Sequence, residues 1–511
     1  MNILLATYTA YPSISGRITF LSILKKKLEN KGHHVDILAH VPGLHEINII
    51  GRQRIEKQPL KSRITSRLAP LLEKKYPGLT AWIRWRELER YTFEEALRQF
   101  DLACYDVIHA HDIISSISCQ RVIQDKPIIT SFHNCKIEEW RVNLEQGAKS
   151  QMELAYVARE EYLSACRPHH VIVPSNWLKA ILTQLKVPKE KISVLPYGID
   201  LAEFQAKMET PLQVRKPRGK KVILCPARLV PIKGHTYLLQ ALEQLKGEHH
   251  SFECWLAGNG ALESRLKQET IDRKLEDVVR FLGARTDIPA LMALADLVVL
   301  PTLHDTSPLV IMEAQIAGVP VISTTIGGVP EMIENGKTGL IGPPRDAAFL
   351  YHAMQMLLSN PAEANKMAIT AKRQSMSKWS VDHVVDQTLE IFKEQLRSFK
   401  PLQPSAKPLA LDDELLTPIS AISEDGNMQK TGTIMGTVTR PTGEPLMQAI
   451  VHVMDISQVA LLTKSCDGNG SFTFSQIPQG KYIVIAAEGH RWISQQLMVR
   501  EDEISVCHVT L

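Results

Sequence analysis

The sequence of 511 residues lacks several features that mark particular classes of protein. Its eight cysteines are dispersed without a Cys-x-x-Cys pair, which is typical of reduced, buried thiols and argues against a disulfide framework. The longest apolar runs, such as residues 291–300, contain a charged residue and fall well short of the roughly 20 residues of a membrane span. The N-terminus has neither the basic region nor the long apolar run of a signal peptide. Together these absences predict a cytoplasmic protein.

The net charge of +4 is small and gives no sign of a nucleic-acid partner, so we expect none. The charge is unevenly placed, however. From Arg52 to Arg90 there are eleven Lys and Arg residues against four acids, which gives +7 for this stretch and −3 for the remainder. Trp82 and Trp85 lie among these charges. The stretch fits a peripheral contact with an anionic membrane at its inner face, or an acidic acceptor, and it fits a solvated helical insertion equally well.

The chain is too long for one hydrophobic core and is expected to hold several domains. Short apolar strands at residues 2–7 and 35–39 flank an amphipathic helix at 18–31, which indicates a parallel sheet covered on both faces. A second series of this kind begins at Lys221, after a joint rich in Pro and basic residues. We therefore predict an α/β protein with two doubly wound domains, residues 1–209 and 210–398. Ligands of such sheets bind outside the carboxyl ends of the strands.

The character of the sequence changes after Phe399. Residues 399–430 are rich in Pro, Ser and charged residues without a sustained period, which predicts a linker. Residues 431–511 contain short alternating strands separated by turns such as Asp467-Gly-Asn-Gly470. This pattern predicts a small all-β sandwich at the C-terminus.

One stretch, HDTSPLVIMEAQIAGVPVI at residues 304–322, combines a helix start with two carboxylates. Ser307 followed by Pro308 is a good helix start, and Gly318 is a good helix stop. The helix follows an apolar strand, so its N-terminus lies at the edge of the sheet where an anion such as a diphosphate is favoured. Asp305 precedes the helix, and Glu313 lies about a turn and a half inside it.

At that place Glu313 can accept two hydrogen bonds from a vicinal diol. Taken alone, the stretch fits a capped core helix with an exposed acid better than a binding site. Its neighbours favour a binding site. Arg228 and Lys233 lie in the loop after the first strand of the second domain, where two cations facing a helix N-terminus form a clamp for a diphosphate. As isolated residues, both cations are also common surface charges.

The order and spacing of these motifs closely resemble glycosyltransferase family 4, a family of retaining enzymes with the GT-B fold. The matching segments are PARLVPIKGHTYLLQAL (226–242), WLAGNGALESRL (255–266) and residues 279–341; YDVIHAHD (105–112), VIVPSNWLKAIL (171–182) and ISVLPYGIDLAEF (192–204) match less closely. The resemblance spans about residues 1–395 and implies two Rossmann-like domains facing a cleft. Residues 431–511 separately resemble a carboxypeptidase regulatory-like domain.

The resemblance assigns roles on the donor side of the cleft. Arg228 and Lys233 would hold the diphosphate of the donor and neutralise it as it leaves. The backbone N–H groups near Leu309 and Val310 would bind the phosphate. Glu313 would bind the ribose hydroxyls of the nucleotide.

The resemblance also assigns residues near the transferred sugar. His111 matches a histidine that faces the sugar and His133 a second position nearby, although a buried structural histidine is the alternative for each. Asp305 takes the place of the family's first Glu and is one methylene shorter. The first loop usually offers Gly-Gly to the donor, whereas here Ser15 precedes Gly16, so only Gly16 keeps that conformational freedom.

The resemblance predicts a retaining glycosyltransferase that moves a sugar from a nucleoside-diphosphate sugar to a glycan or lipid-linked acceptor, in cell-surface polysaccharide synthesis. Because cations supply the charge at the leaving group, we expect neither a metal nor another cofactor, and the sequence has no Asp-x-Asp triplet. Two alternatives remain open. The substitutions at Asp305 and Ser15 suit a weakened nucleotide-sugar or glycan-binding scaffold, and a sugar-nucleotide epimerase shares the architecture.

Overall fold

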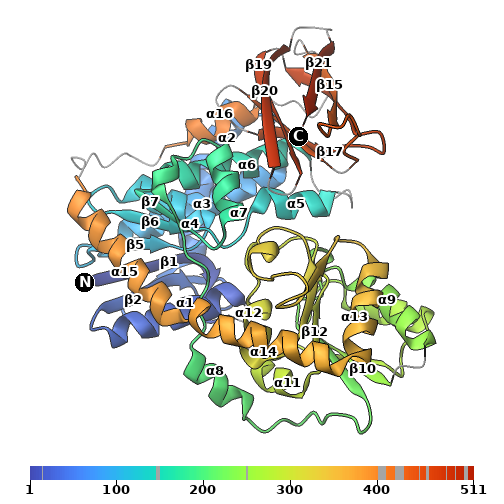
Figure 1. The fold of residues 1–511 in the computed structure, drawn as a ribbon. Helices are drawn as coiled ribbons and strands as arrows, with labels where there is room; N and C mark the ends of the chain where they lie inside the picture. Colours follow the sequence, from blue (N-terminus) through green and yellow to red (C-terminus); the bar gives the residue numbers. More distant parts are fainter. Residues whose placement is uncertain are drawn as a thin grey trace.

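Two sheets of mostly parallel strands follow one another along the chain, each covered by helices (Figure 1). The computed structural model describes the whole chain except residues 14, 145–149, 249–250, 401–409, 421–430, 448, 456–459, 479, 489–490, 500–503 and 511. The central strands of both sheets are largely buried and mostly apolar, because helices cover both of their faces.

The first sheet has eight strands in the order β4-β3-β2-β1-β5-β6-β7-β8, parallel except where β3 pairs with β2 and β4. The strands are β1 (Asn2–Ala10), β2 (His34–His40), β3 (Glu46–Ile49), β4 (Gln53–Glu56), β5 (Val107–Ala110), β6 (Ile128–Ser131), β7 (His170–Val173) and β8 (Ile192–Val194). The helices are α1 (Gly16–Asn30), α2 (Lys57–Lys75), α3 (Ala81–Gln99), α4 (Ile113–Val122), α5 (Lys136–Leu144), α6 (Gln151–Cys166), α7 (Asn176–Gln184) and α8 (Leu201–Met208). The 3-10 turn η1 spans Lys189–Lys191.

The second sheet is parallel throughout and has the order β11-β10-β9-β12-β13-β14. The strands are β9 (Lys221–Cys225), β10 (Phe252–Ala257), β11 (Val279–Gly283), β12 (Leu297–Leu300), β13 (Val321–Thr324) and β14 (Leu340–Gly342). The helices are α9 (His235–Gly247), α10 (Glu263–Asp272), α11 (Ile288–Leu294), α12 (Leu309–Ala317), α13 (Ala347–Ser359) and α14 (Pro361–Lys378), with 3-10 turns η2 (Pro231–Lys233) and η3 (Val329–Glu331). The order is that of a doubly wound sheet, whose direction of winding reverses between β9 and β12.

The predicted boundary of the second domain at residue 398 differs from the structure. The chain crosses back after α14, and α15 (Val381–Ser398) packs against the first domain beside α1 (Figure 1). Its apolar face, which includes Val385 and Phe392, joins the core of the first sheet. The periodicity of an amphipathic helix does not indicate which of two similar domains its apolar face covers. The sequence pattern therefore assigned α15 to the second domain, whereas it packs on the first.

The predicted linker also differs from the structure in part. Within residues 399–430, α16 (Asp413–Ser420) forms a helix on the first domain, and its Leu415, Leu416 and Ile419 are fully buried. Residues 401–409 and 421–430 lie outside the described part of the chain. The eight-residue helix is too short for a periodic signal, and Pro418 inside it reads as a helix breaker.

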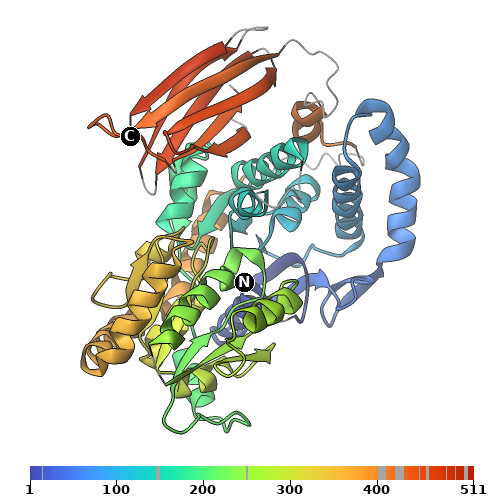
Figure 2. The same ribbon diagram turned by 90° about the vertical axis from the view of Figure 1, so that its right-hand side faces the viewer.

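The C-terminal segment forms two facing sheets, as predicted. The orders are β18-β15-β21 and β17-β16-β19-β20. Both sheets contribute to one apolar core, to which Ile434, Val451 and Val484 belong. The strands are β15 (Thr431–Thr439), β16 (Ile450–Asp455), β17 (Ala460–Ser465), β18 (Ser471–Pro478), β19 (Gly480–Glu488), β20 (Arg491–Val499) and β21 (Ile504–Thr510). In both views this sandwich lies on the side of the first domain (Figures 1 and 2).

Candidate active site

The loops after β9 and β12 meet at the point where the second sheet reverses its direction of winding. Lys233 ends η2 in the first loop, and Asp305 lies in the second. Lys233 Nζ lies 2.5 Å from Asp305 Oδ2, and both side chains are largely buried. Arg228 lies in the same loop as Lys233 and is exposed. The sequence predicted both loops at this edge, but it did not predict the ion pair between them.

A glycine of the next loop holds the backbone of Asp305 in place. Gly327 has a φ of +57°, and a Cβ added there would lie 1.9 Å from the carbonyl oxygen of Asp305. The N–H of the following Gly328 donates to that oxygen at 3.1 Å. Only glycine combines this backbone conformation with so close an approach. The segment after β13 thus supports the loop that carries the carboxylate.

Helix α12 begins at Leu309, with Pro308 rather than Ser307 as its N-cap. The predicted Ser307 cap is therefore wrong: the Ser307 hydroxyl faces the sulfur of Met332 at 3.9 Å, and the helix has no side-chain cap. A helix without a side-chain cap leaves its first N–H groups available to a ligand. The N–H groups of Leu309 and Val310 stand in this position.

Glu313 lies on α12, half-buried, and forms no hydrogen bond or ion pair with a residue that the structure describes. Burial raises the pKa of its carboxyl to about 7, and the charge of Lys207 on α8 opposes this rise only in part. A half-buried carboxyl without a protein partner is suited to accept hydrogen bonds from ligand hydroxyls.

Two predicted histidines of the first domain touch each other. His111 follows β5 and is fully buried, and its Nδ1 lies 3.1 Å from Nε2 of His133, which follows β6. His133 Nδ1 lies 2.7 Å from the hydroxyl of Tyr197. Burial lowers the pKa of His111 and of His133 well below the usual value, and the nearby charge of Arg17 adds to this. Both rings are therefore neutral near pH 7.

The other ring nitrogen of His111, Nε2, is buried without a hydrogen-bond partner in the described structure. An unsatisfied buried polar atom of this kind costs about 1–3 kcal/mol. His111 lines a hollow at the carboxyl edge of the first sheet, together with Thr9, Arg17, Asp112 and His133. This nitrogen is available to a hydroxyl group placed in the hollow.

Two contacts join the two domains at or next to predicted site residues. The Thr306 hydroxyl, next to Asp305, donates to the carbonyl of His133 at 2.7 Å. A Cβ added to Gly16, at the start of α1, would lie 3.2 Å from Cδ1 of Leu309. The N-termini of α1 and α12 therefore face each other across the two domains. The structure thereby places Gly16 and His133 beside the first turn of α12.

The loop that holds Arg228 lies beside the first domain, because η2 contacts α5. Burial would raise the pKa of Glu139 on α5, but the charges of Lys136 and, more weakly, His304 and Arg228 bring it below the usual value. The Glu139 carboxylate also accepts hydrogen bonds from Lys136 and Asn134. Arg228 thus borders the space between the domains, on the side of α5.

Three residues near these contacts were not predicted as site residues. Arg17 donates to the carbonyl of His111 and to the Thr9 hydroxyl, while its Nε is buried without a partner and no described carboxylate is paired with it. Tyr197 and Thr306 hold His133 from two sides. Arg17 follows the predicted Gly16 directly, and this position in the sequence was a signal by which Arg17 could have been predicted as a site residue. Tyr197 and Thr306 become recognisable only once His133 is placed.

Within the described part of the chain, His, Cys, Asp and Glu side chains do not gather in groups of three or more that could hold a metal ion. Nor is any described helix both long enough and apolar enough to cross a membrane.

Two family models match the chain, one over the first sheet and one over the second, and the boundary between the matches lies between β8 and β9. Residues 19–203 match Glycosyltransferase Family 4, and residues 207–374 match Glycosyl transferases group 1. An uncharacterized glycosyltransferase of Methanocaldococcus jannaschii is 25% identical over 405 residues, which cover 77% of this chain and 98% of that protein. The putative colanic acid biosynthesis glycosyltransferase WcaL of Escherichia coli is 31% identical over 222 residues, or 42% of this chain and 53% of that protein.

Solved structures share the fold. Sucrose-phosphate synthase from Thermosynechococcus elongatus superposes with a TM-score of 0.61 at 20% identity, covering 78% of this chain and all of that one. HepE of Anabaena in complex with UDP-glucose gives 0.57 at 21% identity, covering 77% of this chain and all of that one. With the family matches, this likeness shows that residues 19–374 form a glycosyltransferase of the GT-B fold that is similar to family 4.

Proposed function

We propose that the protein is a retaining glycosyltransferase that moves a sugar from a nucleoside-diphosphate sugar to a glycan or lipid-linked acceptor in cell-surface polysaccharide synthesis. One observation carries the proposal. The cation Lys233 and the uncapped start of α12 stand opposite the histidine pair of the first domain, joined by the Thr306–His133 contact. A diphosphate bound at α12 would direct its sugar toward His111.

Charge explains how such a site would act. A leaving diphosphate gains negative charge, which Lys233, Arg228 and the N-terminus of α12 would stabilise, so we propose that transfer needs no metal. The neutral His111 would accept or donate a single hydrogen bond at the sugar. Contact between the domains would exclude water from the reacting carbon.

Retention of configuration is proposed from the resemblance to family 4, and the carboxylates near the site bear only on how retention would be achieved. Asp112 lines the hollow, but its oxygens accept hydrogen bonds from the Thr7 hydroxyl and from the N–H groups of Tyr8 and Ser115. Asp305 is paired with Lys233. The hydrogen bonds to Asp112 oppose a role for it as a nucleophile, whereas Asp305 loses its partner when a donor diphosphate takes Lys233. Because the family that the chain resembles is retaining, we propose that the acceptor itself attacks, on the face from which the diphosphate leaves.

The proposed acceptor class is supported by the names of the relatives. WcaL of Escherichia coli and AmsK of Erwinia amylovora are named for the biosynthesis of colanic acid and of amylovoran, so we propose a polysaccharide precursor as the acceptor.

The proposed donor is supported by a solved structure. HepE has been solved with UDP and with UDP-glucose. We therefore propose a UDP-sugar as the first donor to test.

The Lys233–Asp305 ion pair favours one rival, a weakened nucleotide-sugar-binding scaffold, because a donor must compete with Asp305 for Lys233. To distinguish the enzyme from the scaffold, the release of nucleoside diphosphate is measured with a panel of UDP- and GDP-sugars, and the products are identified by mass spectrometry. Turnover with transfer to a glycan or lipid-linked acceptor supports the enzyme. Saturable binding without turnover on any acceptor would support the scaffold instead.

The ionisation of Glu313 makes donor binding depend on pH. The carboxyl has a pKa of about 7 and binds the ribose hydroxyls only when it is ionised, so affinity rises with pH. From pH 6 to pH 8 the Kd for UDP-glucose is expected to fall about tenfold, as the ionised fraction grows. The diphosphate of a nucleotide sugar does not titrate in this range, and the pKa values of His111 and His133 lie below it. Calorimetry of Glu313→Gln should show weaker binding with a flat pH profile; an unchanged slope would contradict this role.

The proposed contact with an anionic membrane rests on fewer charges than the sequence offered. Eight of the eleven basic residues from Arg52 to Arg90 form ion pairs within the protein, namely Arg52, Lys57, Lys61, Arg63, Lys75, Arg84, Arg86 and Arg90. Arg54 on β4, Arg67 and Lys74 are the three left without an ion pair among the described residues. Arg67 and Lys74 lie on one face of α2, on either side of Leu71, which is 47% exposed.

We expect the double variant Arg67→Gln and Lys74→Gln to bind vesicles containing phosphatidylglycerol about thirtyfold more weakly, at about 1 kcal/mol for each cation. Co-sedimentation measures this, with Lys366→Gln on α14 as the control. Binding that does not change with the anionic lipid content would rule the contact out.

A further inference from the structure

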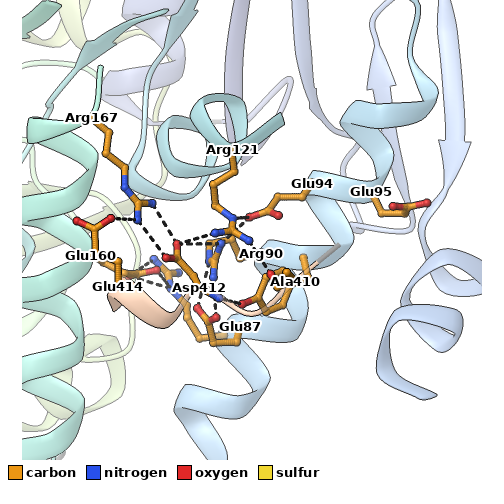
Figure 3. Close-up of polar contacts among 12 residues, drawn as sticks. Glu87, Arg90, Glu94, Glu95, Arg121, Glu160, Arg167, Ala410, Asp412 and Glu414 are labelled. Atoms are coloured by element: carbon orange, nitrogen blue, oxygen red, sulfur yellow. Dashed lines mark hydrogen bonds and ion pairs between the residues drawn. The ribbon is translucent and has the colours of Figure 1, made fainter. Parts of the chain in front are cut away.

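A segment between the glycosyltransferase domains and the sandwich inserts a carboxylate into a pocket of arginines on the first domain (Figure 3). The Asp412 side chain is 2% exposed. Arg167 donates to both of its oxygens at 3.0 and 3.1 Å, and Nη1 of Arg121 lies 3.2 Å from Oδ2. Arg90 Nη1 lies 3.8 Å from the same oxygen. Three guanidinium groups from α3, α4 and the end of α6 thus surround one carboxylate.

Without Asp412 the pocket would carry excess positive charge. Arg90 is fully buried and held by Glu87 and Glu94, which are also fully buried. Arg121 shares Glu94 with Arg90. Among the described residues, Arg167 pairs only with the segment itself, through Asp412 and the more exposed Glu414, so Asp412 supplies the third buried negative charge. Burial would raise the pKa of Asp412, but these arginines hold it far below its usual range, so the carboxylate stays ionised.

The pocket contacts the backbone and the apolar side chains of the segment as well. Arg121 Nη2 donates to the carbonyl of Ala410 at 2.7 Å, and Arg159 Nε donates to the carbonyl of Glu414 at 3.1 Å. The N–H of Asp412 donates to the hydroxyl of Tyr91 at 2.8 Å. Leu415, Leu416 and Ile419 are fully buried in the cluster formed with Ile83, Tyr156 and Leu163. The segment is thus bound in the manner of a short peptide ligand, by the buried carboxylate of Asp412, by two exposed carboxylates, Asp413 on Lys75 and Glu414 on Arg167, and by one apolar helix face.

We propose that the surface formed by α3, α4 and α6 is a docking site for a peptide with an aspartate followed by leucines three and four residues later and an isoleucine seven residues later. Its occupant is residues 410–420 of the same chain. Docking clamps the C-terminal sandwich to the first domain, which is the acceptor side of the proposed enzyme. The docking itself does not depend on the proposed function.

Docking of residues 410–420 shortens the chain segment that connects the sandwich to the first domain. Residues 399–430 would span up to about 110 Å if extended, whereas residues 421–430 alone reach about 35 Å. With α15 also on the first domain and β17 of the sandwich beside α6, the docked segment keeps the sandwich at the first domain. A shorter tether raises the effective concentration of the sandwich at the first domain.

The test compares two adjacent aspartates in the full-length chain by hydrogen–deuterium exchange. Asp412→Asn removes the charge from the buried anchor, whereas Asp413→Asn removes it from a side chain that is 54% exposed and pairs with Lys75. Because removing one partner of a buried ion pair is strongly destabilising, amides 411–419 are expected to exchange at least about tenfold faster in Asp412→Asn and to change little in Asp413→Asn. The radius of gyration in small-angle scattering should rise only in the first variant.

A synthetic peptide of residues 408–421 then tests recognition in trans. Added to full-length Asp412→Asn, the wild-type peptide should restore protection of α3 and α6, and a peptide carrying Asn at 412 should not. If Asp412→Asn exchanges fast throughout the first domain, Arg167→Gln, at the partly exposed rim, replaces it and should give the same local loss. Equal exchange in both aspartate variants, or equal action of the two peptides, would overturn the proposal.

Discussion

Replacing Lys233 with alanine is expected to weaken donor binding by about 3 kcal/mol, or roughly 150-fold in Kd. The variant loses the charge-assisted hydrogen bond to the diphosphate. It also leaves Asp305 without its partner, because the two side chains now form an ion pair at 2.5 Å. A carboxylate freed beside the diphosphate repels it. Calorimetry with UDP-glucose measures the loss, and Lys337→Ala, an exposed lysine of the same domain, is the control.

A double-mutant cycle separates these two effects. Adding Asp305→Asn to Lys233→Ala removes the repulsion and should recover about tenfold of the lost affinity. If the double variant binds no better than Lys233→Ala, Asp305 does not face the diphosphate. If Lys233→Ala alone binds as well as the natural chain, Lys233 is not a donor ligand and the proposed site is wrong.

Replacing His111 with alanine is expected to lower kcat by about 100-fold to 1,000-fold while KM for the donor changes little. The buried Nε2 has no hydrogen-bond partner among the residues that the structure describes, so we expect its hydrogen bond to go to the substrate and to be lost in the variant. Steady-state kinetics on the donor identified above give both constants. The exposed His383 on α15, changed to Ala, is the control for the loss of an imidazole. If His111→Ala lowers the melting temperature but leaves kcat unchanged, His111 is a core residue and not a catalytic one.

His133 should behave as a positioning residue in the same assay. It touches His111 through Nε2 and Tyr197 through Nδ1, and its carbonyl receives the Thr306 hydroxyl. His133→Ala leaves the Nε2 of His111 in place but removes its support, so kcat should fall by about tenfold, less than in His111→Ala.

The sequence predicted those parts of the site whose functional residues lie in a short loop between a recognisable strand and a recognisable helix. Lys233 and Asp305 each lie in a loop between a buried strand and a helix, and a parallel sheet brings such loops to one edge. The pattern therefore placed the candidate donor site at the start of α12 without tertiary information. It missed the pairing of the two side chains, and it placed the helix cap on Ser307 because Ser-Pro is the usual signal.

The failures share a different cause. Asp412 lies 321 residues after Tyr91, to which its N–H donates, and Thr306 lies 173 residues after His133. Contacts over such separations leave no period in the sequence. The short helix α16 adds a Pro and flanking charges that resemble a linker. Burial of Leu415, Leu416 and Ile419 on the first domain overrides that local preference.

By itself, then, the sequence determined the two doubly wound domains, the C-terminal sandwich and the loops that carry Lys233, Asp305 and Glu313, because each depends on strand and helix periods that are local. Only the tertiary structure decided which domain α15 covers, which partner each charge takes and where Asp412 is bound. Those outcomes depend on burial: a carboxylate or an apolar helix face is stabilised by whichever complementary surface removes it from water, and the folded chain alone brings that surface near.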